Sequence, residues 1–262
     1  MRSLLASPLG LLIGLSLGAL GGGGSILAVP ALVYAAGQSA KGATTTSLIL
    51  VAFTSLIGLV PHWRAGRVRW SAGVLFGLAG IGGSLLGSHW NSAADPDVLL
   101  LAFSGLMFVA GGAMVRRLRR SRRSEGGAAP TSTTIAIDAG TFVKVLAAGS
   151  GIGLLTGFFG VGGGFVIVPA LVLALGFTMT EAVGTSLLVI TINSLVALAT
   201  RLHAGNIQWG TVVPFTIASL VGVVVGGRLA GTRDHSTLQR WFVVLLFTVA
   251  SYTAVKSALA VW

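Results

Sequence analysis

Apolar and polar positions divide the chain into eight long apolar segments separated by short polar stretches. A membrane-spanning helix needs about 20 predominantly apolar residues. The segments approach or exceed that length and lack the alternation of a membrane β-barrel. They are residues 4–36, 43–61, 70–90, 97–115, 141–176, 182–200, 209–230 and 240–260. The pattern predicts an all-α polytopic membrane protein.

The second half of the chain repeats the first at an offset of 139 residues. GALGGGGSILAVPALVYAAG at 18–37 aligns with GFFGVGGGFVIVPALVLALG at 157–176, and Trp70 aligns with Trp209. One gapless register over most of the first half indicates an internal duplication. The predicted parts are a first repeat at 1–116, a basic cytoplasmic linker at 117–140, and a second repeat at 141–262.

The first and fifth segments are too long for one upright helix at a rise of 1.5 Å per residue. Glycines interrupt both, at Gly21–Gly24 in the first and at Gly160 and Gly162–Gly164 in the fifth. Glycine runs weaken helices and allow unusual backbone geometry. Irregular backbone at membrane depth is tolerated only inside protein or beside a watery cavity. Each segment is therefore expected to break into two half-helices.

Two topologies are compatible with these breaks. If the broken segments cross the membrane, each half crosses four times and the repeats are parallel. If they fold back as re-entrant hairpins, each half crosses three times and the repeats are inverted. The basic residues favour inversion, because they lie in one loop of the first repeat and in a different, non-corresponding loop of the second. They are Arg64, Arg67 and Arg69 in the first repeat, and Arg228, Arg233 and Arg240 in the second.

Composition supports a membrane location and excludes several kinds of functional site. Hydrophobic residues make up 54% of the chain and charged residues only 9%, against about 25% charged in an ordinary soluble domain. The net charge of +11 includes six arginines between Arg116 and Arg123, which indicates a cytoplasmic loop. No aromatic residue is interleaved with them, so nucleic acid is not an expected partner. The absence of Cys excludes thiolate metal sites and thiol catalysis.

Acidic residues are confined to loops and segment ends, so no carboxylate is expected at mid-membrane. This distribution suits an anionic substrate. The N-terminus of a half-helix can hold an anion on its free N–H groups, and two glycine breaks would bring two such ends together. The predicted substrate-binding residues are Gly22, Gly23, Gly24, Ser25, Thr46, Ser47, Gly162, Gly163, Gly164, Thr185, Ser186 and Asn193. The alternative is that the glycines permit close helix packing and the hydroxyls bond to preceding carbonyls.

Other side chains give little sign of catalysis. The four His lie at segment ends or in loops without metal-ligand spacing, so solvated or interfacial side chains are expected. No HExxH or GxSxG motif occurs. The six Trp fall near segment ends, as in an aromatic belt. We therefore expect no enzyme activity, no cofactor and no metal site.

Several motifs that occur in both repeats resemble one known family. They are V-P-A-L-V at 29–33 and 168–172, a Gly at 37 and 176, Thr-Ser-Leu at 46–48 and 185–187, and A-G-x-[VI]-x-W at 65–70 and 204–209. On these residues the chain resembles the TauE/SafE sulfite exporters and toluenesulfonate uptake permeases. One departure is Thr180-Glu181, where the first repeat has Lys41-Gly42. An anion-attracting role for Lys41 would therefore lack a symmetric partner.

The resemblance implies a membrane carrier of sulfite, sulfonates, sulfoacetate or related anions, with export the family's better-known direction. The resulting prediction is a multi-pass protein of a bacterial-type inner membrane that moves a small sulfur-containing anion by alternating access. An anion channel, a carrier of other small organic anions and a membrane enzyme are the alternatives. The expected partners are the small anion and the lipid bilayer. The oligomeric state stays open, with a homodimer as one option.

Overall fold

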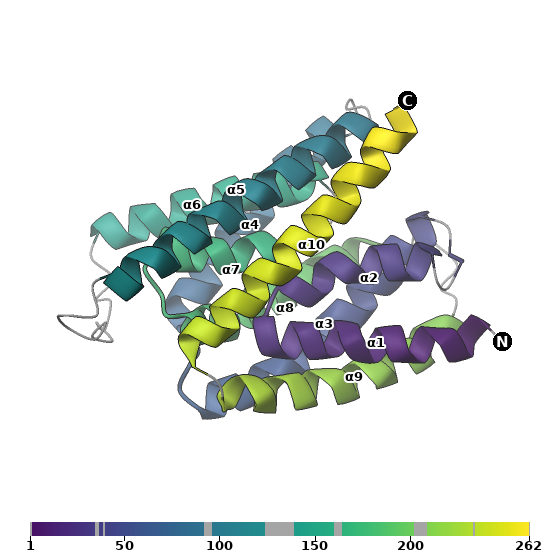
Figure 1. Cartoon of the computed structure of the whole chain (residues 1–262), viewed down its shortest axis with the longest axis horizontal. Coiled ribbons are helices and arrows are strands. Elements are labelled where there is room, and N and C mark those ends of the chain that lie inside the picture. The colour runs from purple at the N-terminus through teal and green to yellow at the C-terminus, as the bar shows by residue number, and fades with distance from the viewer. Residues whose placement is uncertain are drawn as a thin grey trace.

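A computed structural model describes residues 2–34, 37–38, 40–91, 96–123, 139–159, 164–201, 209–232 and 234–261. Within these ranges the chain forms ten helices and no strand (Figure 1), which confirms the all-α prediction. The helices are α1 (Arg2–Leu20), α2 (Gly23–Tyr34), α3 (Ala40–Arg64), α4 (Trp70–Asn91), α5 (Pro96–Arg123), α6 (Ala139–Phe159), α7 (Gly164–Leu173), α8 (Met179–Arg201), α9 (Trp209–Gly231) and α10 (His235–Val261).

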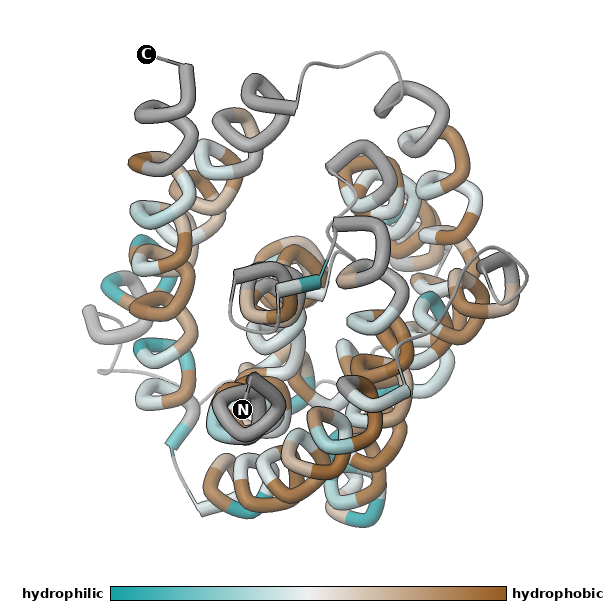
Figure 2. The backbone as a smooth tube through the Cα atoms, turned by 90° about the vertical axis from the view of Figure 1, so that its right-hand side faces the viewer, coloured by the Kyte–Doolittle hydropathy of each residue, from teal (hydrophilic) through white to brown (hydrophobic). Residues whose placement is uncertain are grey.

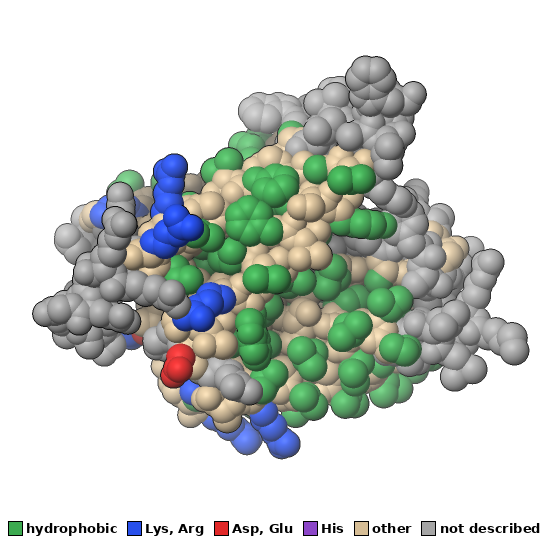
Figure 3. Space-filling model, viewed as in Figure 1, with side chains coloured by type: hydrophobic (Ala, Val, Ile, Leu, Met, Phe, Trp, Pro, Cys, Tyr) green, Lys and Arg blue, Asp and Glu red, His purple; other side chains and the backbone are tan. Residues whose placement is uncertain are grey.

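Five of these helices, α3, α4, α8, α9 and α10, are long and apolar enough to cross a membrane. Their outward side chains are also apolar, and Figures 2 and 3 show hydrophobic residues along the helices and over the outer surface. Leu78, Leu85, Val213, Ile217 and Val244 are between 47% and 68% exposed. Such a surface matches lipid hydrocarbon rather than water. The chain is a multi-pass membrane protein.

The first apolar segment forms two helices that fold back on each other. α1 ends at Leu20, Gly21 has a left-handed φ of 69°, and α2 then returns along α1. A Cβ on Gly24 would overlap the Ile13 carbonyl of α1. Glycine is needed here both for the turn and for the close approach of two backbones. The fifth segment contains α6 and α7, but its predicted break at residues 160–163 lies outside the described residues.

Small residues let α1 pack tightly along α9. Glycines of α1 spaced four residues apart face carbonyl oxygens of α9 with the same spacing: Gly10, Gly14 and Gly18 face Phe215, Ser219 and Val223 in that order. The Ser219 hydroxyl also donates a 2.9 Å hydrogen bond to the Gly10 carbonyl. The matched spacing means that α1 and α9 run parallel, and the small residues allow their backbones to touch.

The same contacts occur between α6 and α4, shifted by 139 residues. Gly149 and Gly153 of α6 face the carbonyl oxygens of Phe76 and Gly80 of α4, which are the positions that correspond to Phe215 and Ser219. A helix from the first half thus packs on the second half, and a helix from the second half packs on the first. The two halves interlock and share one core.

Two further helix pairs lie at the junction of the halves. α3 crosses α8 antiparallel, with Thr191 donating a 2.9 Å hydrogen bond to Ser55 and Gly184 packed against His62. α5 lies antiparallel to α10, where the Gln239 amide donates a 3.1 Å hydrogen bond to the Met114 carbonyl. Each pair joins helices that occupy the same place in the two halves of the sequence.

The turns that follow α2 and α7 are also alike. Gly37 and Gly176 have left-handed φ values of 67° and 73°. The residue after each glycine then bonds back to the helix: the backbone N–H of Gln38 donates to the Leu32 carbonyl, and that of Phe177 donates to the Leu171 carbonyl, both at 3.1 Å. Glycine favours this conformation because it has no Cβ. The Gly seen at both positions in the sequence therefore has a backbone role.

Basic side chains on the face seen in Figure 3 gather at one end of the molecule. Arg67, after α3, approaches Gly231 at the end of α9, and Arg117 near the end of α5 donates a 3.3 Å hydrogen bond to the Gly176 carbonyl. We call this end of the molecule the basic end.

α5 continues to Arg123, so helix extends into the first part of the predicted linker at 117–140. Arginine favours helix, which accounts for this extension. Residues 124–138 lie outside the described part of the chain.

Candidate functional site

The candidate site lies in the interior, where the start of α2 meets the start of α7. α2 begins at Gly23 and α7 begins at Gly164. A Cβ on Gly22 would overlap the Gly164 carbonyl, and a Cβ on Gly164 would lie 3.3 Å from the Gly22 Cα and 2.6 Å from the Ser25 Oγ. The N-termini of two half-helices, one from each half of the chain, are therefore in direct contact.

Hydroxyl groups surround this contact from two helices. Ser25 of α2 and Ser186 of α8 are 3% and 0% exposed, and the Ser186 Oγ lies against Gly21. The Ser25 hydroxyl donates a 2.7 Å hydrogen bond to the Gly22 carbonyl, and the Ser186 hydroxyl donates a 2.8 Å bond to the Val183 carbonyl. The backbone N–H of Ser25 also bonds to the Gly22 carbonyl, at 3.3 Å, so the other N–H groups at the starts of α2 and α7 are the donors left for an anion.

The remaining predicted residues fall into three groups. Gly23 and Gly24 are buried beside the contact, where Gly23 faces the Leu245 side chain and Gly24 faces α1. Thr46 and Ser47 are buried in the first turns of α3. Gly162 and Gly163 lie outside the described residues.

Thr185 and Asn193 lie on α8 but face α4. The Thr185 hydroxyl accepts a 3.1 Å hydrogen bond from the Arg69 backbone N–H, and its methyl group lies next to Gly73. Asn193 lies near Gly80, and its Oδ1 is buried without a hydrogen-bond partner among the described residues. Thr185 therefore joins α8 to the turn before α4, one position away from the Ser186 that faces the break.

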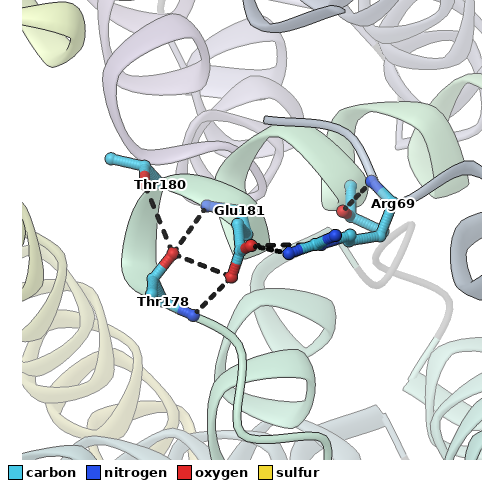
Figure 4. Close-up of polar contacts among 5 residues, drawn as sticks. Arg69, Thr178, Thr180 and Glu181 are labelled. Carbon is cyan, nitrogen blue, oxygen red and sulfur yellow. Dashed lines mark hydrogen bonds and ion pairs between the residues drawn. The ribbon is translucent and has the colours of Figure 1, made fainter. Parts of the chain in front are cut away.

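A polar network that the sequence reasoning missed lies beside Thr185 (Figure 4). Arg69 donates hydrogen bonds of 3.0 and 2.6 Å to the Glu181 Oε1. The Glu181 Oε2 accepts bonds from the backbone N–H and the hydroxyl of Thr178, at 3.1 and 3.0 Å. This is a capping box at the start of α8 with an ion pair added. The spacing Thr178-x-x-Glu181 was a visible signal for the cap, but no sequence pattern pointed to Arg69 as the partner.

His62 was expected to be solvated or interfacial, and that expectation is wrong. Although His62 is close to the end of α3, it is only 2% exposed. Its ring lies beside the Gly18 carbonyl, yet neither ring nitrogen has a hydrogen-bond partner within the described residues. α1 at Gly18 and α8 at Gly184 pack against it and bury it. Over the part of the chain that is described, no three His, Cys, Asp or Glu side chains form a metal-binding group.

Comparison with known proteins gives consistent relatives along almost the whole chain. A sequence model of the family described as "Sulfite exporter TauE/SafE" matches residues 6–253. A probable membrane transporter protein of Xylella fastidiosa is 33% identical over 253 residues, which cover 94% of this chain and 92% of the relative. The probable membrane transporter protein YdhB of Bacillus subtilis is 26% identical, covering 87% of this chain and 90% of its own. No solved structure matches.

Proposed function

The chain belongs to the TauE/SafE sulfite exporter family of membrane transporters, and we propose that it carries a small sulfur-containing anion by alternating access. The family description suggests sulfite as the cargo and export as the direction, and the resemblance of the sequence motifs adds a sulfonate or a sulfoacetate-like anion as candidate cargo. The names of the relatives add only that they are probable membrane transporters.

We further propose that the carrier consists of two inverted repeats. Contacts at the 139-residue offset support this, because α1 on α9 and α6 on α4 use corresponding glycines. The antiparallel pairing of α3 with α8 and of α5 with α10 also supports it, since corresponding helices then run in opposite directions. The fold-back of α2 on α1 fits a re-entrant hairpin. Inverted repeats of this kind provide two related conformations around one midplane site.

The observation that carries the proposed site is the contact of the α2 and α7 N-termini at Gly22 and Gly164. Two positive helix ends meet inside apolar protein, where an anion bound to N–H groups is stabilised. None of the side chains described around this contact is a carboxylate that would repel the anion. Ser25 and Ser186 border the site, while Thr46, Ser47, Gly162 and Gly163 complete it in the proposal.

The basic end would face the cytoplasm of a bacterial-type inner membrane. Positive residues are retained on the cytoplasmic side of membrane proteins, and Arg67, Arg117 and Glu181-bound Arg69 all lie at this end. The opposite end would then face the periplasm. Lipid and the anion are the proposed partners.

The test is anion flux in proteoliposomes that contain the purified protein. A carrier should show saturable flux of sulfite, a sulfonate or thiosulfate, together with exchange of internal for external anion. Flux without saturation or exchange would favour a channel. No binding and no movement of any of these anions would overturn the proposed function.

A further inference from the structure

His62 is a buried ionisable side chain that the proposed anion site does not use. It is 2% exposed, and its two ring nitrogens lack hydrogen-bond partners within the described residues. Burying an unpaired polar group costs free energy. Ionisable residues kept inside a membrane protein commonly mark ion pathways or proton relays.

The position of His62 connects the candidate site to the basic end. On α1 its neighbour is Gly18, three residues before the Gly21 turn. On α8 its neighbour is Gly184, two residues before Ser186, which faces the same turn. His62 therefore lies within about one helical turn of the candidate site along both neighbouring helices, a rise of about 5.4 Å.

Charges around His62 are arranged so that a bound anion would favour its protonation. Arg67, in the turn after α3, lies near His62, and its positive charge repels a positive charge on the His62 ring. The acid on α8 is Glu181, but Arg69 and Thr178 occupy its two oxygens. α9 contributes Arg228, which is exposed, and α1 has no ionisable residue between Pro8 and Leu20. An anion in the site is thus the charge that could balance an imidazolium at His62.

We propose that His62 is the proton-binding residue that couples proton movement to anion transport, an inference that rests on the proposed function. When the basic end opens, water reaches the imidazole, one proton binds to a ring nitrogen, and the anion enters beside the resulting imidazolium. The pair crosses with no net charge, and the proton and the anion leave together on the other side. Export by this route is driven by a cytoplasmic excess of the anion that exceeds the opposing pH difference. The second repeat has Arg201 at the corresponding position, so only the first repeat has an imidazole there, a group that can both take up and release a proton.

Proteoliposome transport of a radiolabelled alkyl sulfonate tests this coupling, because a sulfonate keeps its charge over the whole pH range. With one proton per anion, an acidic exterior one pH unit below the interior should drive accumulation of about tenfold. H62Q should lose this accumulation, and any sulfonate exchange that it shows at equal pH should no longer depend on the pH. H235Q, altered at the first residue of α10, is the matched control and should behave as the wild type. Undiminished accumulation by H62Q would overturn the proposal.

A second measurement needs only the wild-type protein and so does not depend on how H62Q folds. Adding sulfonate to the purified protein in weak buffer near neutral pH should raise the solution pH as the protein takes up protons. Sulfonate binding without proton uptake would also overturn the coupling role. If the wild type neither binds nor exchanges any sulfur anion, the proposed function itself fails, which is a different result from either of these.

Discussion

Individual glycines in this chain have different roles, and the atoms that face each one identify its role. Gly14 and Gly153 face carbonyl oxygens of neighbouring helices that run alongside them. Gly22 faces the carbonyl of Gly164, at the point where two half-helices begin. Gly82 has open space around it. The alternative of close helix packing therefore applies to many glycines, and only those at the break belong to the proposed site.

At the residue scale, G22A should impair transport strongly. The added methyl group would push the α2 and α7 N-termini apart and misplace their N–H donors. Loss of one charge-assisted hydrogen bond corresponds to about a tenfold or larger loss of anion affinity. Anion binding to the purified variant and to the purified wild type measures this loss of affinity. G82A is the control, and it should bind normally and be stabilised by about 0.5–1 kcal/mol. Equal anion binding by G22A and the wild type would argue against the site.

Glu181 has two separable roles that substitutions can distinguish. E181Q keeps an acceptor for the cap at Thr178 but removes the charge facing Arg69. E181A removes both the acceptor and the charge, so it should lower the free energy of unfolding by about 0.5–2 kcal/mol more than E181Q does. The ion pair is partly exposed, at 32% and 16%, so its own contribution should be about 1 kcal/mol or less. Denaturant unfolding in detergent micelles measures the difference. Equal stability of the two variants would show that the cap contributes little.

At the scale of elements, parallel packing of α1 on α9 and of α6 on α4 replaces ordinary side-chain interdigitation with backbone contact. Transmembrane helices gain little from the hydrophobic effect in lipid, so close packing of small residues becomes a main source of association. The α3–α4 turn is held differently, by the Arg69 and Thr185 bonds to α8.

Alanine at corresponding positions of the two interfaces should have similar effects. G14A and G153A each place a methyl group against a backbone carbonyl that cannot move freely. Overpacking of this kind typically costs about 1–3 kcal/mol. G151A lies on the same helix as Gly153 but has open space around it, so it should not destabilise the protein. Thermal unfolding in detergent gives the comparison. A destabilised G151A would mean that helix propensity or lipid contact dominates instead.

At the scale of the whole molecule, the two proposed topologies differ in which loops share a side of the membrane. The exposed positions Ala65 and Ala174 lie at the basic end in the structure. Inverted repeats place both on the same side, whereas parallel repeats place them on opposite sides.

The absence of Cys from the native chain makes this a direct experiment. In intact cells, A65C and A174C should both be protected from an impermeant maleimide and should react only after the membrane is permeabilised. G210C, at the other end of α9, should react from outside. Opposite labelling of A65C and A174C would indicate parallel repeats.

Much of the fold was predictable because the lipid environment constrains sequences strongly. Apolar length predicted the helices, and the 139-residue offset indicated which helices correspond. The bounds of α5 were less predictable, since arginine is polar yet favours helix, and the helix continues to Arg123. For the candidate site, sequence singled out Gly22 and Ser25 because glycine runs inside apolar segments are unusual. It did not separate Ser186 from Thr185, adjacent residues that face different helices.

By itself the sequence determined the helical membrane class and the family and predicted two repeats, because these depend on local composition and on similarity along the chain. Tertiary structure decided that α1 packs on the other half, that Arg69 pairs with Glu181, and that His62 is buried. These features depend on residues more than 40 positions apart in the chain. No local pattern records such contacts, since they arise only when the two halves interlock.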